Sequence, residues 1–292
     1  MDSSLSLSDG RRVGVCEWGD REGWPVLLVH GTPGSAKWRP GPAGLSHVRE
    51  RGVRLITVSR PGYGVSDRLV GRTVAAWAGD AAEVLTVLGA GSDVGIVGVS
   101  GGGPHALACG ARLSGTRAVA VLAGAGDLAI DEAFVGMADA SAELWRSAFE
   151  SGGALETMIG RIASAMTRRR PAEVAERVLA GFPPSAVALM ERDPQVRRVM
   201  VDDVVEAFAG GGWGWLDDAR AFRSPWEFDL AEVAVPVWLA HGVDDEFAPV
   251  HQAQRLAGEL PDAMMSIRSD VGHMDLIADA FNEAVDWLIA QR

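Results

Sequence analysis

The sequence predicts an α/β fold, with a mostly parallel sheet of eight strands, flanking helices and an inserted block of helices. Short, continuously apolar runs recur along the chain, and helix-like segments separate them. Such runs are typical of strands buried on both faces of a parallel sheet. Strand-like runs stop between about 127 and 225 and then return. We therefore expect a core domain of 1–126 and 226–292 and a helical cap, or lid, of 127–225.

The strands are indicated by hydrophobic pattern. The segment 3–8 alternates with a period of two, whereas runs such as PVLLVH and VGIVGV are apolar throughout. The eight expected strands are, in chain order, 3–8, 12–18, 25–30, 53–59, 94–99, 118–122, 235–241 and 263–269. Because helix-like segments separate most of them, the sheet is expected to be mainly parallel.

Helix-like patterns occupy the intervals. In 74–88 the apolar residues recur at spacings of three and four, and Gly89 then ends the segment. The other helices expected around the sheet are 104–113, 252–260 and 279–291. Within the inserted block the expected helices are 132–149, 155–167, 171–179 and 194–209. A helical insertion of this size is typical of a lid over the functional edge of a sheet.

The composition limits the classes of molecule that the protein is expected to bind. The chain has 292 residues, 48% of them hydrophobic, and a net charge of -12, which opposes binding to nucleic acid phosphates. The two cysteines, Cys16 and Cys109, give no disulfide or metal pattern. The first residues lack a basic stretch followed by an apolar one, and no apolar run is long enough to span a membrane. We therefore expect a cytoplasmic protein that acts on a small molecule, as a monomer or homodimer.

Polar residues follow four of the expected strands. His30 and Thr32 lie in HGTPG after the third, Ser100 follows the fifth, HGVDD ends the seventh, and His273 follows the eighth. The carboxyl ends of parallel strands meet at one edge of a sheet, where ligands bind. A serine, an acid and a histidine are therefore expected to meet there, which is the set that nucleophilic acyl transfer requires.

These motifs resemble those of the α/β-hydrolase superfamily. Residues 98–102, GVSGG, match GxSxG between a strand and a helix, and HGTPG, HGVDD and GH occur in the same order. The resemblance implies an α/β-hydrolase fold with the cap after strand 6. It also implies Ser100 as nucleophile, His273 as general base, and the amides of Thr32 and Gly101 as the oxyanion hole.

Two adjacent aspartates compete for the third catalytic role. The family pattern places the acid three residues after the glycine of HG and four before a proline, which favours Asp245 over Asp244. Asp127, just past the sixth strand, is a further alternative because a minority of relatives carry the acid there. Among the other histidines, His30 and His241 are expected to be structural.

The segment RPGYGVSD follows the fourth strand and also resembles a superfamily loop. We expect a structural turn in which Arg60 bridges to an acid.

Four tryptophans are candidates for substrate contact: Trp38, Trp145, Trp213 and Trp215. No metal or phosphate-loop motif occurs, so no cofactor is expected.

The leading interpretation is a serine hydrolase, a carboxylesterase, that cleaves a small to medium, partly apolar ester through an acyl-enzyme. Two alternatives use the same triad: a proline-iminopeptidase-like enzyme and a carbon–carbon bond hydrolase. The first of these fits HGTPG and RPGYG but would carry GGSWG where this chain has GVSGG. A ligand-binding protein or a lyase that keeps the fold is a third alternative.

Overall fold

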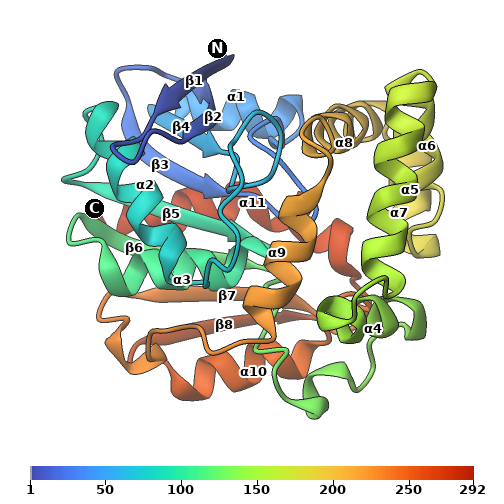
Figure 1. Ribbon diagram of the computed structural model, residues 1–292. Coiled ribbons are helices and arrows are strands. Elements are labelled where there is room, and N and C mark those ends of the chain that lie inside the picture. The colour runs from blue at the N-terminus through green and yellow to red at the C-terminus, as the bar shows by residue number, and fades with distance from the viewer. Residues whose placement is uncertain (1) are drawn as a thin grey trace.

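The computed structural model describes residues 2–292 and contains one eight-stranded sheet in the order β1-β2-β4-β3-β5-β6-β7-β8 (Figure 1). The strands are β1 (Asp2–Ser6), β2 (Arg12–Gly19), β3 (Trp24–Val29), β4 (Val53–Val58), β5 (Val94–Val99), β6 (Thr116–Leu122), β7 (Val237–Gly242) and β8 (Ala263–Arg268). The β1–β2 and β2–β4 pairs are antiparallel, and the other five are parallel. The predicted strands are thus confirmed.

Helices cover both faces of the sheet. They are α1 (Pro42–Glu50), α2 (Ala76–Val87), α3 (Gly102–Arg112), α10 (Val250–Glu259) and α11 (His273–Ala290). Successive strand residues point to opposite faces: Leu27 belongs to the buried cluster that contains Trp77 of α2, whereas Leu28 belongs to the cluster that contains Phe281 of α11. Figure 1 accordingly shows α2 and α3 on the near side of the sheet and α11 on the far side. Both faces of the parallel strands are therefore buried.

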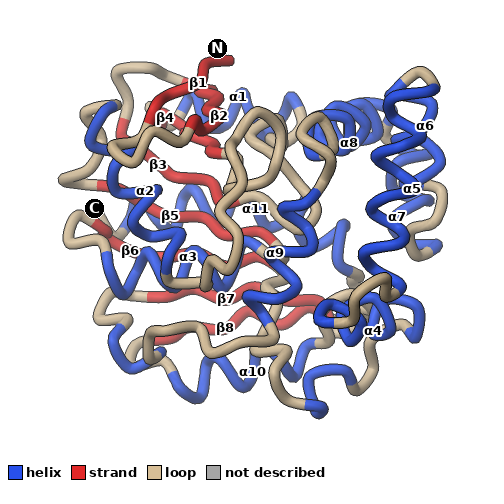
Figure 2. The backbone as a smooth tube through the Cα atoms, viewed as in Figure 1, coloured by secondary structure: helices blue, strands red, loops and turns tan. Residues whose placement is uncertain are grey.

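The interval between β6 and β7 is helical. It contains η1 (Asp131–Phe134), α4 (Asp139–Arg146), η2 (Ser147–Phe149), α5 (Ala154–Arg168), α6 (Pro171–Leu179), α7 (Pro184–Arg192), α8 (Pro194–Ala207), α9 (Trp213–Phe222) and η3 (Leu230–Glu232). Figure 2 shows α5, α6 and α7 beyond the ends of the strands, at the right of the view. These helices extend past the edge at which β3, β5 and β7 end.

Two predicted helices differ from the structure, and the structure contains helices, among them α9, that were not expected. The expected helix 132–149 is split into η1, α4 and η2; Gly136, which lies between η1 and α4, has φ +79, outside the range of a right-handed helix. Helix α11 begins at His273, six residues before the expected 279, and α7 was not expected. Within residues 2–292, no helix is both long and apolar enough to cross a membrane.

Candidate active site

Ser100 lies on a sharp turn between β5 and α3. Its φ is +53, a left-handed conformation that is uncommon for a residue other than glycine. Its amide donates a hydrogen bond to the carbonyl of Leu122 on β6, at 2.9 Å. A Cβ at Gly102 would collide with the carbonyl oxygen of Val29, so the helix can begin this close to β3 only with glycine there. The turn projects the serine beyond the end of its strand.

Two more glycines of the GVSGGG segment allow close packing around the turn. A Cβ at Gly98 would lie 2.6 Å from the Cβ of Ala106. A Cβ at Gly103 would lie 2.9 Å from Cγ1 of Val121 on β6. Gly103 therefore lets α3 pack closely on the end of β6, a role that the sequence did not indicate.

The serine, histidine and aspartate expected at this edge form a continuous chain of hydrogen bonds. Oγ of Ser100 lies 2.9 Å from Nε2 of His273, and Nδ1 of His273 lies 2.7 Å from Oδ2 of Asp245. Oδ1 of Asp245 accepts hydrogen bonds from the amides of Phe247 and Ala248, each at 2.9 Å. We call Ser100, His273 and Asp245 the relay.

The electrostatics of the relay fix the imidazole tautomer. Asp245 is only 3% exposed, and this burial by itself would raise the pKa of its carboxyl group. The interaction with His273 and hydrogen bonds from His241 and His273 outweigh burial and lower that pKa below its usual range. The carboxylate therefore stays ionised and accepts a hydrogen bond from Nδ1–H of His273, which leaves Nε2 as the nitrogen that accepts a hydrogen bond from the Ser100 hydroxyl.

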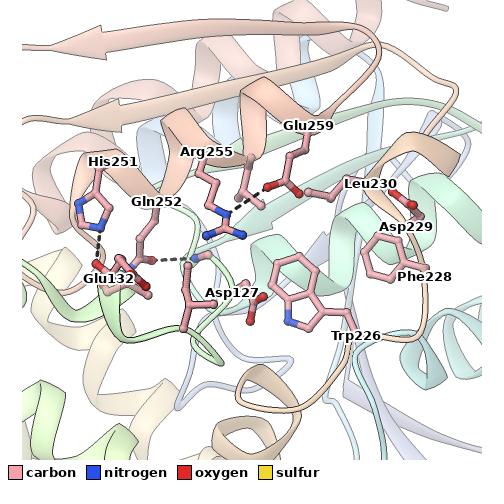
Figure 3. A pocket seen from close by; sticks show the side chains of 14 residues that line it. Asp127, Glu132, Trp226, Phe228, Asp229, Leu230, His251, Gln252, Arg255 and Glu259 are labelled. Atoms are coloured by element: carbon pink, nitrogen blue, oxygen red, sulfur yellow. Dashed lines mark hydrogen bonds and ion pairs between the residues drawn. The ribbon is translucent and has the colours of Figure 1, made fainter.

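The two other aspartates considered as partners of His273 are not part of the relay. Asp244 is exposed, although it is adjacent to the relay aspartate in the chain. Asp127 lines a separate pocket of about 350 Å³ together with Trp226 and Arg255 (Figure 3). Within residues 2–292, neither carboxylate is hydrogen-bonded to His273. The geometry therefore favours Asp245 over both.

The amides of Thr32 and Gly101 lie next to Ser100. The position of a Cβ on Gly101 would be 3.3 Å from the Thr32 nitrogen, and that of a Cβ on Gly31 would be 3.9 Å from Oγ of Ser100. The Thr32–Pro33 peptide bond is cis. In residues 2–292 neither amide donates a hydrogen bond to another protein group. Two N–H donors are thus available beside the serine hydroxyl.

The Thr32 side chain is held by a buried ionic cluster that the sequence analysis missed. Its hydroxyl donates to Oδ2 of Asp218 at 2.6 Å, and the Arg60 guanidinium donates to Asp218 at 2.7 Å and to Oγ1 of Thr32 at 2.9 Å. Arg72 and the Tyr63 hydroxyl also donate to Asp218. The cluster ties α9 to the loop that carries the Thr32 amide. Arg60 bridges to an acid, as its loop predicted.

Asp218 carries its charge without exposure to solvent. Burial would raise the pKa of its carboxyl group, but Arg60 and Arg72 lower it well below the usual range. The signal that could have identified this residue is the Asp217–Asp218 pair within the apolar segment WGWLDDARAF. That segment does not indicate which arginines would be its partners.

The buried histidines outside the relay bond backbone carbonyl groups, so they hold loops. The pairs are His30 with Gly31, His105 with Gly101, and His241 with Ala248. In the described residues 2–292, no group of three or more His, Cys, Asp or Glu side chains could hold a metal ion.

A small cavity of about 70 Å³ opens beside Ser100 and His273. Its other walls are mostly apolar, and Trp38 is among the residues that line it. An adjoining pocket of about 180 Å³ shares Trp38, Met200, Met274 and Ile277 with it. Together they could accommodate a partly apolar molecule.

The other three candidate tryptophans do not line this cavity. Each packs against another side chain. The ring centroids of Trp145 and Phe222 are 5.8 Å apart, and those of Trp215 and Phe208 are 6.3 Å apart. Cζ of the Arg68 guanidinium lies 5.1 Å from the ring centroid of Trp213. The structure therefore brings only Trp38 of the four next to Ser100. The others contribute to packing of the helical insertion.

Comparison with known proteins agrees with this architecture. A non-heme chloroperoxidase from Streptomyces lividans is 26% identical over 294 residues, which cover 94% of this chain and 98% of that one. The enol-lactonase from Burkholderia xenovorans LB400 superimposes with a TM-score of 0.68 at 19% identity, over 99% of this chain and 100% of the other.

A thermophilic esterase from Thermogutta terrifontis superimposes with a TM-score of 0.66 at 19% identity, over 100% of this chain and 99% of the other. At these identities the solved structures show a shared fold. The model of the alpha/beta hydrolase family matches residues 26–286, which is most of the sequence. The chain belongs to the alpha/beta hydrolase family.

Proposed function

We propose that the protein is a serine hydrolase that cleaves a carboxylic ester through an acyl-enzyme. Ser100 is the nucleophile, His273 the general base, and Asp245 the residue that orients the imidazole. The observation that carries the proposal is the relay itself, with separations of 2.9 Å and 2.7 Å between its members. These distances are those at which a base accepts a hydroxyl proton and is itself held in one orientation.

In the first half of the reaction, Oγ of Ser100 attacks the ester carbonyl carbon while its proton passes to Nε2 of His273. The carbonyl oxygen becomes an oxyanion, which accepts hydrogen bonds from the amides of Thr32 and Gly101. The tetrahedral intermediate then collapses, the bond to the alcohol oxygen breaks, and Nε2 returns the proton to that oxygen. The alcohol leaves, and the acyl group remains bonded to Ser100.

In the second half a water molecule replaces the alcohol. His273 accepts a proton from the water as its oxygen attacks the acyl carbon, and the same amides stabilise the second oxyanion. Collapse of this intermediate breaks the bond to Oγ, which takes the proton back from Nε2. The acid product leaves, and Asp245 keeps the imidazole in the same orientation throughout.

The helical segment 127–225 is proposed to be the cap that shapes the substrate site. Met200, Asp203 and Val204 of α8 and Phe182 of the α6–α7 loop line the cavity beside Ser100. Most of these side chains are apolar, which supports an ester with an apolar part. We propose the remainder, 1–126 and 226–292, as the core domain.

A substrate panel tests the proposed reaction. Initial rates would be measured on 4-nitrophenyl esters from acetate to octanoate and on prolyl 4-nitroanilide, with Ser100→Ala as the control. We expect hydrolysis of the esters, with little activity on the anilide and none above background in the variant. Cleavage of the anilide alone would contradict the ester assignment and favour an aminopeptidase.

A further inference from the structure

A carboxyl group lies in the cavity beside Ser100 and has no part in the mechanism above. Of the side chains that line this cavity in the described chain, only that of Asp203 carries a carboxyl group. Asp203 comes from α8 and is 2% exposed, whereas its neighbours on the cavity wall, Met200 and Val204, are apolar. A buried polar group in such surroundings needs a hydrogen-bond partner.

Among residues 2–292, only one of its two oxygens has such a partner. The Ser35 hydroxyl donates to Oδ1 of Asp203 at 2.7 Å, and the amide of Lys37 donates to the Ser35 oxygen at 3.1 Å. Throughout residues 2–292, Oδ2 accepts no hydrogen bond, and no cationic side chain lies within 4.0 Å of the carboxyl group. Oδ2 is thus the oxygen left for a ligand.

The surroundings favour the protonated form of this acid. Burial raises the pKa of Asp203 to about 7, against the opposing effects of the Ser35 hydrogen bonds and the charge of Arg60. Glu206, one turn further along α8, raises it as well, and His273 faces the same cavity. Because Oδ1 accepts from Ser35, the proton belongs on Oδ2, where it makes a hydrogen-bond donor on a residue that lines this mostly apolar cavity.

We propose that Asp203 is a specificity residue that, as a neutral carboxylic acid, donates a hydrogen bond from Oδ2 to a carbonyl oxygen in the acyl part of the substrate. The inference rests on the proposed function, because the acyl group is the part that remains bonded to Ser100 in this small cavity. It narrows the substrate class to esters and lactones of oxo acids, whose acyl chain carries a second carbonyl group.

The test compares esters that differ only at this carbonyl group. The substrates are 4-nitrophenyl 4-oxopentanoate and pentanoate, with 5-oxohexanoate and hexanoate as a second pair. The ratio of kcat/KM within each pair is measured from pH 5.5 to pH 9. Any pH dependence of the chemical steps at the relay affects both members of a pair alike, so the ratio reports on recognition of the oxo group.

At pH 6 we expect at least one pair to give a ratio about fivefold above that of Asp203→Leu, the effect of one hydrogen bond. The ratio falls toward the Leu value above pH 8, because an ionised carboxylate cannot donate. Asp203→Asn keeps an elevated ratio that does not change with pH, since its amide N–H donates without titrating. Asp202→Asn, a control at a half-exposed carboxylate paired with Arg39, keeps the wild-type profile.

Three results would overturn the proposal. One is a wild-type ratio that does not change with pH, a readout that stands even if Asp203→Leu fails to fold. Another is an equal ratio in wild type and Asp203→Leu. The third is a preference for a 4-trimethylammoniobutanoate ester that grows above pH 8 and is lost in Asp203→Asn, since an ionised carboxylate would then bind a cation.

A binding measurement separates this inference from the proposed function. In the Ser100→Ala background, methyl 4-oxopentanoate is expected to bind about fivefold more tightly than methyl pentanoate at pH 6. Adding Asp203→Leu removes the difference. If wild type cleaves no ester but the binding difference persists, the proposed function fails and the recognition role of Asp203 stands. If every ester is cleaved without discrimination, the reverse holds.

Discussion

Replacing Asp245 by asparagine changes one atom of the relay, Oδ2, which also lies 3.3 Å from Nε2 of His241. The asparagine carbonyl oxygen can keep the two hydrogen bonds, each 2.9 Å long, that Oδ1 accepts from the amides of Phe247 and Ala248. Its NH₂ group then faces Nδ1 of His273, where the wild type has a carboxylate oxygen at 2.7 Å. A donor in that place requires Nδ1 to accept, which moves the imidazole proton to Nε2.

A proton on Nε2 points at the Ser100 hydroxyl and prevents the ring from acting as a base. The variant also loses the negative charge that stabilises the imidazolium form of His273. By analogy with other triads, we expect kcat to fall by about 10⁴, which corresponds to about 5 kcal/mol of activation free energy. Since the backbone hydrogen bonds are kept, the free energy of unfolding should change far less than this.

The assay is 4-nitrophenyl butyrate hydrolysis, with kcat and KM determined separately and folding checked by circular dichroism and urea unfolding. Asp244→Asn is the matched control, because it makes the same replacement at an exposed neighbour. We expect the control to keep kcat within about twofold of wild type. Similar losses in the two variants, or a loss below tenfold in a folded Asp245→Asn, would refute the assignment of Asp245.

Three stability predictions follow from the surrounding geometry, each measured by urea unfolding. Gly102→Ala should lower the free energy of unfolding by about 3 kcal/mol or more, because the added Cβ would collide with Val29. Gly160→Ala, at an exposed position of α5, should raise it by up to about 1 kcal/mol. Equal effects of the two substitutions would contradict this reasoning. Asp218→Asn should cost about 3–5 kcal/mol by leaving the buried Arg60 and Arg72 uncompensated, well above Asp217→Asn, whose partner Arg68 is partly exposed. In the folded protein the pKa of Asp203 is raised from 3.8 to about 7, so wild type loses free energy of unfolding as pH rises between these values. The free energy of unfolding of Asp203→Asn should therefore rise by roughly 2 kcal/mol relative to that of wild type from pH 5 to pH 8. A difference between the two proteins that does not change with pH would contradict the raised pKa.

The sheet could be predicted from the sequence because parallel strands carry their own signal. β5 is VGIVGV, and all six of its residues are buried, as a continuous apolar run indicates for a strand covered on both faces. Helix ends were less predictable. α11 was expected at 279 but begins at His273, where the sequence Gly272-His273 was interpreted as a loop. Helix starts depend on contacts that local pattern does not contain.

The relay could be predicted from the sequence because each of its members follows a strand, and the sheet places the carboxyl ends of these strands at one edge. The roles of Asp203 and Asp218 could not be predicted in this way. An acid on a helix indicates a solvent-facing position on average, yet these two bond Ser35 and Arg60, which are more than 150 residues away in the chain. Burial of a charge is decided by such distant partners. Trp145, Trp213 and Trp215 show the converse, since aromatic character alone did not indicate which side chains reach the cavity.

The central claim is that Ser100 is an activated nucleophile. Incubation of the purified protein with a fluorophosphonate probe, followed by peptide mass spectrometry, tests it directly, because the probe reacts covalently with serines that an adjacent base activates. We expect a single modified residue, Ser100, and loss of labelling in Ser100→Ala. Folded wild-type protein that remains unlabelled at Ser100, or equal labelling of the variant, would contradict it.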